Sequence, residues 1–490
     1  MRVLLVEPRT PDTFWSFRNA LPFVGKRASN PPLGLLTFAG LLPRAWELKV
    51  VDLNCRPLPA ADVQWADYVL VSAMLAQRDS LLEVIATCRA AGKPMIGGGP
   101  LFTAEAADNP GVDHVVVGEA EETAAALVAD LEAGRVRPLY EAPRYPDLSL
   151  TPLPRWDLID LREYATMSVQ SCRGCPFDCE FCDVVALNGH KPRYKTPERF
   201  LAELEALRER GWRGQTFLVD DNFVGDPRRC KELLRAMIGW RRATRARMTF
   251  LTEASVNMAE DPELLRLMVE AGFKKVFLGI ETPSAESLQE CHKTQNLRSD
   301  LPTAVRRIQH AGLEVMGGFI VGFDSDRPDI FQRQFEFIQS AGVVTAMVGM
   351  LQAIPRSRLY RRLAGEGRLL GDGGGDNTKA TFNFVPKLDR EYLLENYRLL
   401  MRRLYEPNAY YRRARTLLAN HRSRGPRAHL SRSDLQALAK SLWCLGIRER
   451  GRRAYWRFLT TTLLQHPDRL GLAVTLAITG RHFRIVAKAL

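Results

Sequence analysis

The chain carries the sequence Cys175-Pro-Phe-Asp-Cys179-Glu-Phe-Cys182, a C-x3-C-x2-C run, with a fourth cysteine, Cys172, just before it. The chain has nine cysteines in 490 residues, which is few, and four of them fall in this one stretch. Such clustering indicates a metal site in a reducing compartment and not a disulfide framework.

Two kinds of metal site are compatible with this spacing. A structural zinc ion would take Cys172 as its fourth ligand, but two zinc knuckles normally need a longer connection than the three residues found here. Three thiolates on one loop instead suit three irons of a [4Fe-4S] cluster, which leaves the fourth iron free for a ligand that is not protein. We therefore predict that Cys175, Cys179 and Cys182 bind a cluster and that Cys172 does not.

The cysteine run follows the first strand of a β/α series. Buried apolar runs predict six strands, with helical stretches between them. The strands are expected at 166–171, 216–219, 248–252, 275–280, 314–321 and 345–351, and helices at 197–209, 228–240, 262–271, 301–311 and 330–339. Six strands are too few for a closed eight-stranded barrel, so we expect a partial, open barrel over residues 161–365.

Residues 1–140 show a second alternation of short apolar runs and helical periodicity. Strands are expected at 3–6, 48–51, 68–71, 94–96 and 114–117, and helices at 33–42, 80–91 and 121–132. This pattern predicts an α/β domain with a doubly wound parallel sheet, in which a ligand binds at the carboxyl ends of the strands. The run Gly97-Gly98-Gly99-Pro100 at one strand end would let the backbone approach a bulky flat ligand, although glycines there are also ordinary turn chemistry.

Prolines interrupt the pattern between residues 141 and 160, which we interpret as an extended linker. Residues 366–490 are expected to form a mostly helical C-terminal domain after a flexible break at Gly371 to Gly375. Residues 401–490 hold 19 Lys/Arg and 4 Asp/Glu, a net charge of +15 against +13 for the whole chain. This asymmetry predicts that the segment prefers anionic partners.

The cysteine run, with Phe181 before its last cysteine and a six-stranded partial barrel around it, resembles the radical S-adenosylmethionine (SAM) enzymes. The resemblance implies that the open iron chelates SAM and that one electron, from a donor such as flavodoxin or ferredoxin, splits SAM into methionine and a carbon radical. By resemblance, the strand ends and Phe181 contact SAM. The residues so implied are Phe181, Asp220, Asp221, Asn222, Glu253, Gly279, Glu281, Gly317 and Gly322.

A doubly wound domain directly before such a barrel resembles the cobalamin-binding class of radical SAM enzymes. The whole chain is similar to the subgroup of hopanoid C-methylases and bacteriochlorophyll side-chain methyltransferases. The resemblance implies a cobalamin site at the sheet edge. Its expected contacts are Ser72, Gln77, Gly97, Gly98, Gly99, Gly118 and Glu119. This chain lacks the Asp-x-His-x-x-Gly motif by which many cobalamin proteins supply a histidine to cobalt. A parallel sheet that no longer binds cobalamin therefore stays an alternative.

The resemblance implies C-methylation of an unactivated carbon in a hydrophobic metabolite, such as a terpenoid lipid or a tetrapyrrole. One alternative keeps the radical chemistry without net methylation, in a cyclisation, rearrangement or C–C bond formation. A second alternative is a tRNA-modifying radical enzyme that grips phosphates with its basic tail. The tail shows no recognisable RNA-binding module, which makes a nucleic-acid partner the weaker interpretation.

The sequence also predicts where the protein resides. The longest apolar run, Leu470 to Ile478, is shorter than the roughly 18 residues of a spanning helix, and Glu7 and Pro8 end the N-terminal run before a signal peptide could form. We expect a cytoplasmic protein. In the basic tail, aromatic residues on amphipathic helices suggest peripheral contact with an anionic membrane, or else a solvated basic surface over a helical core. They are Tyr405, Tyr410, Tyr411, Trp443, Tyr455, Trp456 and Phe458.

Overall fold

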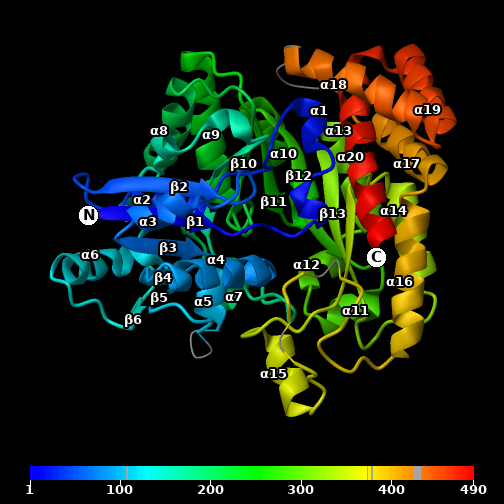
Figure 1. Cartoon of the computed structure of the whole chain (residues 1–490). Helices are drawn as coiled ribbons and strands as arrows, with labels where there is room; N and C mark the ends of the chain where they lie inside the picture. Colours follow the sequence, from blue (N-terminus) through cyan, green and yellow to red (C-terminus); the bar gives the residue numbers. More distant parts are fainter. Residues whose placement is uncertain (106–108, 372, 377–378, 423–431) are drawn as a thin grey trace.

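The structure is a computed structural model and describes residues 1–105, 109–371, 373–376, 379–422 and 432–490. Two six-stranded sheets lie beside each other, and a group of helices from the C-terminal part covers the far side of the second sheet (Figure 1). The predicted α/β class, with a doubly wound sheet, a partial barrel and a helical C-terminal region, is confirmed.

The N-terminal sheet is wholly parallel, in the order β2-β1-β3-β4-β5-β6. Its strands are β1 (Arg2–Glu7), β2 (Glu47–Asp52), β3 (Tyr68–Ser72), β4 (Met95–Gly98), β5 (His114–Val117) and β6 (Leu139–Glu141). The intervening helices are α1 (Leu21–Val24), α2 (Leu33–Ala39), α3 (Ala60–Trp65), α4 (Arg78–Ala90), α5 (Pro100–Ala104) and α6 (Ala124–Glu132). Along β1, Val3 and Leu5 enter one hydrophobic core while Leu4 and Val6 enter another. Both faces of this sheet are therefore covered, as a continuous apolar strand requires.

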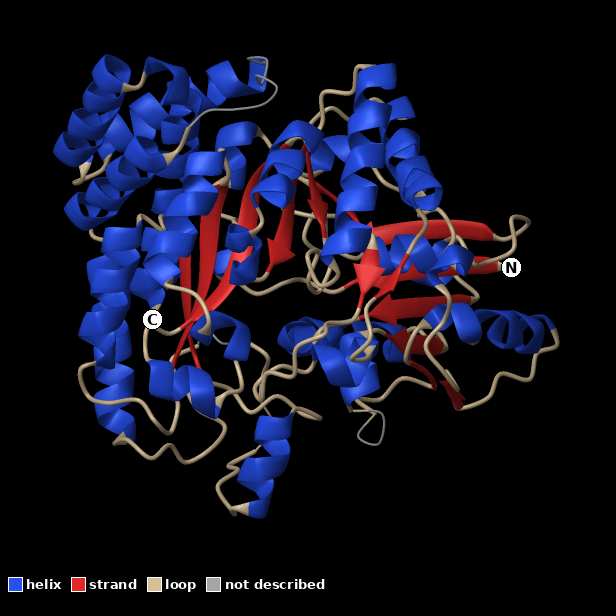
Figure 2. Ribbon diagram, turned by 180° about the vertical axis from the view of Figure 1, so that it is seen from behind, coloured by secondary structure: helices blue, strands red, loops and turns tan. Residues whose placement is uncertain are grey.

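The central sheet is also parallel and runs in the order β14-β13-β12-β11-β10-β7. Its strands are β7 (Met167–Val169), β10 (Gln215–Leu218), β11 (Thr249–Ala254), β12 (Phe273–Glu281), β13 (Glu314–Val321) and β14 (Ala346–Met350). Its helices are α7 (Val184–Asn188), α8 (Pro197–Glu209), α9 (Pro227–Thr244), α10 (Pro262–Ala271), α11 (Ala285–Glu290), α12 (Thr294–Leu297), α13 (Leu301–Ala311) and α14 (Ile330–Ala341). Within the described residues β7 and β14 do not pair with each other, so the barrel is open (Figure 2).

Local sequence explains why several of these helices begin where the periodicity predicts. Thr196-Pro197, Asp226-Pro227 and Asp261-Pro262 each place a capping side chain directly before a proline at the first helical position. The cap accepts a backbone N–H that has no partner inside the helix, and proline fixes the helical φ angle. Gly272 ends α10 in the left-handed conformation, which glycine adopts without steric cost.

The stretch predicted as an extended linker is more ordered than expected. Its first residue, Glu141, ends the sixth strand of the N-terminal sheet, and three short 3-10 helices follow at Leu148–Leu150, Trp156–Leu158 and Leu161–Glu163. Trp156 is 2% exposed and belongs to the main hydrophobic core. The prolines therefore remove regular periodicity without removing burial. The proposed domain boundaries themselves stay predictions.

The C-terminal part is helical, as predicted. Its helices are α15 (Arg358–Gly365), α16 (Arg390–Leu404), α17 (Pro407–Asn420), α18 (Arg432–Trp443), α19 (Arg452–Gln465) and α20 (Leu470–Ala489). A π-helical segment, Cys444–Arg448, follows α18 directly. Asp372, within the predicted flexible break, and the basic stretch 423–431 lie outside the described residues.

Of the two interpretations of the tail aromatics, the structure favours a helical core for most of them. The side chains of five are at most 2% exposed, because they pack against α20 and against each other. These five are Tyr405, Tyr410, Tyr411, Tyr455 and Phe458. Only Trp443 and Trp456 remain substantially exposed, at 56% and 41%. The aromatic residues are therefore mainly the core of a helical domain.

One C-terminal helical segment is longer and more apolar than the sequence predicts. The segment Pro467–Ala489 is long and apolar enough to cross a membrane when judged by length and composition alone. About half of it, 56% of the relevant window, is buried inside the protein. His482, in its C-terminal half, is fully buried and contacts the carbonyl oxygens of Thr13 and Phe14. These contacts fit the core helix of a folded domain.

Candidate active site between the two sheets

The three cysteines of the C-x3-C-x2-C run lie on one loop at the carboxyl edge of the central sheet. The thiols of Cys175, Cys179 and Cys182 are close enough to influence each other's titration. Burial raises the pKa of all three, and the ammonium group of Lys293 opposes that rise. In the described part of the chain, no three His, Cys, Asp or Glu side chains gather as they would around a single metal ion. A cubane cluster binds each thiolate through a different iron, and three thiolates on one loop suit such a cluster.

Cys172 stands apart from this loop. It begins β8 (Cys172–Arg173), which pairs with β9 (Arg193–Tyr194) in an antiparallel hairpin that the sequence did not reveal. Its side chain is fully buried, and its Sγ lies 3.9 Å from the carbonyl oxygen of Asn222. Burial, together with Asp220, raises the pKa of its thiol well above the ordinary value.

Two aspartates after β10 hold the start of the cysteine loop. The Asp220 carboxylate accepts hydrogen bonds from the backbone N–H of Ser171 at 2.7 Å and of Cys172 at 3.0 Å. Asp221 accepts from the backbone N–H of Gly174 at 2.7 Å and from the Asn188 amide at 3.0 Å. Burial raises the pKa of Asp220 to about 6. Their observed partners are the loop itself, so a direct contact with SAM stays a prediction for both.

Glu253, near the end of β11, is a carboxylate without a partner. Its side chain forms no hydrogen bond or ion pair with any described residue. Burial raises its pKa to about 8, and the nearby Asp221 and Asp220 raise it further. Lys293 opposes this rise but donates its hydrogen bond to Glu281, so the half-buried Glu253 carboxylate has no direct cationic partner and fits a contact with a positively charged ligand.

A buried ion pair lies at the end of β12. The ammonium group of Lys293 donates to Glu281 at 2.8 Å, and it lies 5.8 Å from the centre of the Phe181 ring. Glu281 adopts a positive φ of 62° beside a β-bulge, and a side chain at Gly279 would collide with this pair. Burial opposes the charge of Lys293, but Glu281 and the thiols of the cysteine loop hold its pKa above the usual value. Sequence reasoning missed Lys293, because it lies in a loop without periodicity.

The other residues expected at SAM take different positions around this edge. The Asn222 amide lies 3.8 Å from the Cys175 Sγ, beneath the cysteine loop. Gly317 lies inside β13, where an added Cβ would meet Phe319 at 2.8 Å. Gly322 follows β13 with a φ of 103° and donates its backbone N–H to Asp326 at 2.8 Å. Both glycines therefore shape the strand and the turn beside the site.

The carboxyl edge of the N-terminal sheet contains the glycine run expected to face cobalamin. At Gly98 an added Cβ would meet nothing closer than 3.8 Å, whereas at Gly97 it would collide with the Phe102 ring. Gly99 has a φ of 92°, and an added Cβ there would meet the Ser72 Oγ at 2.6 Å. Met74 in the neighbouring turn is 47% exposed although it is apolar. An open backbone surface beside an exposed apolar side chain fits a bulky, partly apolar cofactor.

Gln77 ends the 3-10 helix η2 (Leu75–Gln77), and its side chain is fully used inside the fold. The amide donates to Glu7 and to the Pro8 carbonyl, each at 2.8 Å, and accepts from the Met74 backbone N–H at 2.8 Å. Gln77 therefore fixes the turn that carries Met74, and its contact with cobalamin stays a prediction.

The carboxyl group of Glu7, at the same edge, is expected to make the stability of the fold depend on pH. Burial raises its pKa from 4.5 to about 8, and Asp52 contributes to the rise. A raised carboxyl pKa means that the folded state holds its proton more tightly, so this stability is complete below about pH 4.5 and is lost as the pH rises towards 8. We expect Glu7→Gln to reduce the loss of thermal stability between these pH values, by an effect of a few kcal/mol.

Differential scanning calorimetry of the protein without cofactors at several pH values measures this effect. Glu47→Gln is the matched control, because Glu47 is exposed at the start of the neighbouring strand β2. If Glu7→Gln and the unaltered protein lose stability equally as the pH rises, then Glu7 is ionised in the fold.

Glu119 connects the edges of the two sheets. It follows β5, and its carboxylate forms ion pairs with Arg173 and Arg193 of the β8–β9 hairpin. Arg173 also pairs with Glu121 at 2.9 Å, and all four side chains are less than one-fifth exposed. The hairpin leads into the cysteine loop, so the edge expected to bind cobalamin lies directly against the support of the cluster site. Sequence reasoning found Glu119 but neither arginine.

The comparisons with known proteins agree with this arrangement. A model of the radical SAM superfamily matches residues 169–352, a model of the B12 binding domain matches residues 27–128, and a domain of unknown function, DUF4070, matches residues 357–490. The fold of the solved cobalamin-dependent SAM radical enzyme OxsB is similar, with a TM-score of 0.61 at 13% identity over 100% of this chain and 80% of that one. The class is therefore a radical SAM enzyme with a cobalamin-binding domain.

Relatives with higher sequence identity define the family within that class. An uncharacterized methyltransferase of Synechocystis sp. is 40% identical over 99% of this chain and 91% of its own length. The hopanoid C-2 methylase of Rhodopseudomonas palustris is 34% identical over 95% of this chain and 90% of its own length. The chain belongs to the family of cobalamin-dependent radical SAM methyltransferases, and its cofactors are a [4Fe-4S] cluster, SAM and cobalamin.

Proposed function

We propose that this enzyme methylates an unactivated carbon of a hydrophobic small molecule, and that a terpenoid lipid is its substrate class. The bound cofactors would supply a hydrogen-abstracting radical and a methyl group. The observation that carries the proposal is the ion-pair network of Glu119, which sets the cobalamin edge against the support of the cysteine loop. A terpenoid is favoured over a tetrapyrrole by the 34% identity to a hopanoid C-2 methylase.

The chain's own residues would position the reactants and exclude water from them. Residues 373–376 pack against η2 at the cobalamin edge, where an added Cβ at Gly375 would meet Leu75 at 2.7 Å. Further along the same connection, Phe382 packs on Gly322 at the end of β13. The described residues on the two sides of 377–378 therefore contact both sheet edges, which suits a role in keeping solvent away from a radical reaction.

We assign the site residues from these contacts. Cys175, Cys179 and Cys182 would hold the cluster, with Asp220 and Asp221 positioning their loop. Glu253, Glu281 and Phe181 would face SAM, and Lys293 would orient Glu281. The turn at Ser72 and the glycines from Gly97 to Gly99 would face cobalamin. Gln77, Glu119 and Gly118, whose backbone N–H donates to the Thr103 hydroxyl at 3.0 Å, would hold the turns around it.

The substrate and reaction are tested by mass spectrometry of products from the anaerobically reconstituted enzyme supplied with terpenoid lipids, a reductant and SAM. A gain of one methylene, with two SAM molecules consumed per turnover, is the expected result. An unchanged mass with a rearranged skeleton would instead indicate cyclisation or rearrangement. Turnover of tRNA and not of lipids would favour the RNA alternative.

The assignment of Glu253 gives a second prediction. Because no described cation forms an ion pair with its carboxylate, Glu253→Gln should weaken SAM binding about tenfold, the loss expected for a charge-assisted contact, and leave the iron content unchanged. Equilibrium dialysis of SAM against the reconstituted protein, with iron measured in parallel, provides both values.

The control is Glu260→Gln, which alters an exposed carboxylate a few residues further along the chain. SAM affinity that is unaffected by Glu253→Gln would place SAM elsewhere. A parallel loss of iron would make Glu253 a support of the cysteine loop instead.

A further inference from the structure

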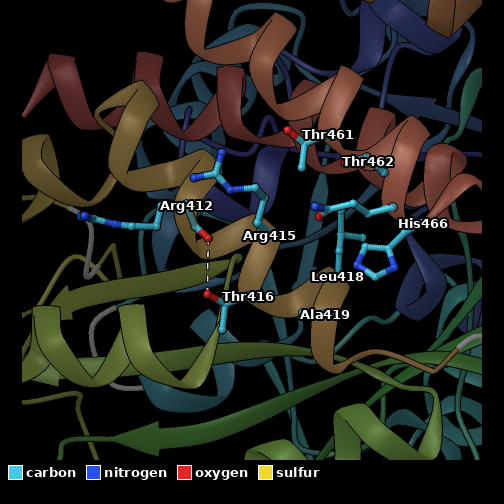
Figure 3. Close-up of a pocket in the computed structure, with 9 residues that line it drawn as sticks. Arg412, Arg415, Thr416, Leu418, Ala419, Thr461, Thr462 and His466 are labelled. Carbon is cyan, nitrogen blue, oxygen red and sulfur yellow. Dashed lines mark hydrogen bonds between the residues drawn. The ribbon is translucent and has the colours of Figure 1, made fainter.

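A cavity lies in the C-terminal domain, between helices that carry none of the residues of the two sheet edges. It has a volume of about 370 Å³ and lies between α17 and α19. Its polar lining comes mainly from Arg412, Arg415, Thr416, Thr461, Gln465 and His466. Figure 3 shows Arg415 between the two helices on the side of Thr461, whereas the Arg412 side chain extends outward from α17.

No described carboxylate neutralises the positive charge at this cavity. Arg412 and Arg415 form no ion pair with any described carboxylate, and neither does Arg457 on α19. Burial lowers the pKa of Arg415, and the neighbouring Arg457 and Arg412 lower it further, so the three cations are close together. Glu449, which lies just before α19 in the sequence, pairs with Arg481 and Arg484 instead. Such an uncompensated cluster favours a bound anion.

Hydrogen-bonding groups around the cavity are also available. Within the described chain, the side chains of Thr461, Gln465 and His466 form no hydrogen bond, although each can donate one. Guanidinium groups combined with hydroxyl and amide donors are suited to the several oxygens of a phosphate group. The cavity therefore has the chemistry of a phosphate site.

The last turns of α19, which line one side of this cavity, also carry exposed apolar side chains on the other side of the helix, and these indicate the source of the phosphate. Leu463 and Leu464 lie between the lining residues Thr462 and Gln465 in the sequence, and they are 54% and 83% exposed. Trp456, 41% exposed, precedes Leu463 by seven residues and so shares its face of α19. Exposed leucines and tryptophan beside unpaired arginines are typical of a surface that lies at a membrane interface.

We propose that the cavity between α17 and α19 binds the phosphate of an anionic phospholipid headgroup, with Leu463 and Leu464 inserted at the bilayer surface. This contact goes beyond methyl transfer and does not depend on the substrate class. It assigns a role to the region matched by a family model of unknown function. It also moves the membrane contact from the tail aromatics, which are mostly core, to the exposed end of α19.

Sedimentation of the full chain with vesicles tests this proposal. We expect the unaltered protein to bind vesicles of phosphatidylcholine mixed with phosphatidylglycerol, to release them at high salt, and to bind pure phosphatidylcholine poorly. The double variant Arg412→Gln/Arg415→Gln should bind the anionic vesicles about 30-fold more weakly, from the contribution of two cations near an anionic surface. Leu463→Ser/Leu464→Ser, which alters only exposed side chains, should also weaken binding.

The matched control is Arg242→Gln/Arg247→Gln. These two arginines are exposed at the end of α9 and just after it, and their removal lowers the net charge by the same amount. Circular dichroism of every variant checks that the helices are intact. Equal weakening by the control and the cavity variant would reduce the effect to net charge and overturn the proposal.

Calorimetry with inorganic phosphate separates the lipid from a soluble source. If the unaltered protein binds inorganic phosphate through Arg412 and Arg415 but does not bind anionic vesicles, the site serves a soluble phosphate and the lipid proposal fails. The lipid proposal also fails if the protein binds RNA through the cavity arginines and does not bind anionic vesicles.

Discussion

Alanine at any one of Cys175, Cys179 or Cys182 is expected to remove most of the cluster iron and all detectable methyl transfer, whereas Cys172→Ala should keep both. The three thiols share one loop, and each would bind a different iron, so the loss of one leaves the cluster with two protein ligands. Cys172 lies instead in the β8–β9 hairpin, fully buried, with its Sγ directed towards the Asn222 carbonyl. Its removal costs packing and not coordination.

The measurement is iron and sulfide per chain after anaerobic reconstitution, together with the visible absorption of the cluster. Cys230→Ala is the matched control for a buried thiol, because Cys230 lies inside α9 and is 1% exposed. If Cys172→Ala loses as much iron as Cys179→Ala while Cys230→Ala does not, then Cys172 is a ligand and the three-ligand assignment is wrong.

The regular elements around this loop could be predicted closely, for identifiable physical reasons. Strands buried on both faces appear in the sequence as continuous apolar runs, as at β13, whose predicted limits match the structure. Helices such as α8 and α10 carry a cap and a proline at their first residue, which marks their start in the sequence. Short elements were missed: β6 has three residues with only Tyr140 buried, and the two strands of the hairpin have two residues each.

The polar contacts of the site were less predictable, because loops have no periodicity. The sequence placed Asp220 and Asp221 at a strand end, but it could not show that their carboxylates bind the backbone of the cysteine loop. It likewise gave no signal for Lys293, which pairs with Glu281 from a loop between two short helices. The partner of a buried charge depends on tertiary contacts, which a single sequence does not specify.

The C-terminal domain illustrates the limit of an amphipathic pattern. Periodicity indicates that one face of each helix is apolar, but not what covers that face. Here α20 covers much of it, since Tyr410 donates its hydroxyl to the Leu476 carbonyl at 2.6 Å and Tyr405 stacks on Phe483 at 5.2 Å. What remains at the surface is a smaller apolar group beside unpaired arginines, and only the structure distinguishes it from the core.

Cobalamin binding provides the other large expected effect. Gly98→Leu should abolish binding of cobalamin while the protein remains folded and keeps its cluster. At this position an added Cβ would meet only Val116, at 3.8 Å, so the fold tolerates a side chain there. A leucine would instead project from the carboxyl edge of β4, over the open surface next to Met74 where we place the flat cofactor. The same change at Gly97 would be uninformative, because its side chain would collide with Phe102 inside the domain.

Spectrophotometric titration with hydroxocobalamin measures the affinity, and iron content shows whether the cluster site survives. Gly98→Ala is the matched control, since a single methyl group at 3.8 Å from its neighbour should reduce the affinity far less than leucine does. Undiminished corrin binding by Gly98→Leu would place the cofactor elsewhere. Loss of iron along with cobalamin would mean that the two edges joined by Glu119 unfold together, and the leucine would then report on the domain contact and not on the cofactor surface.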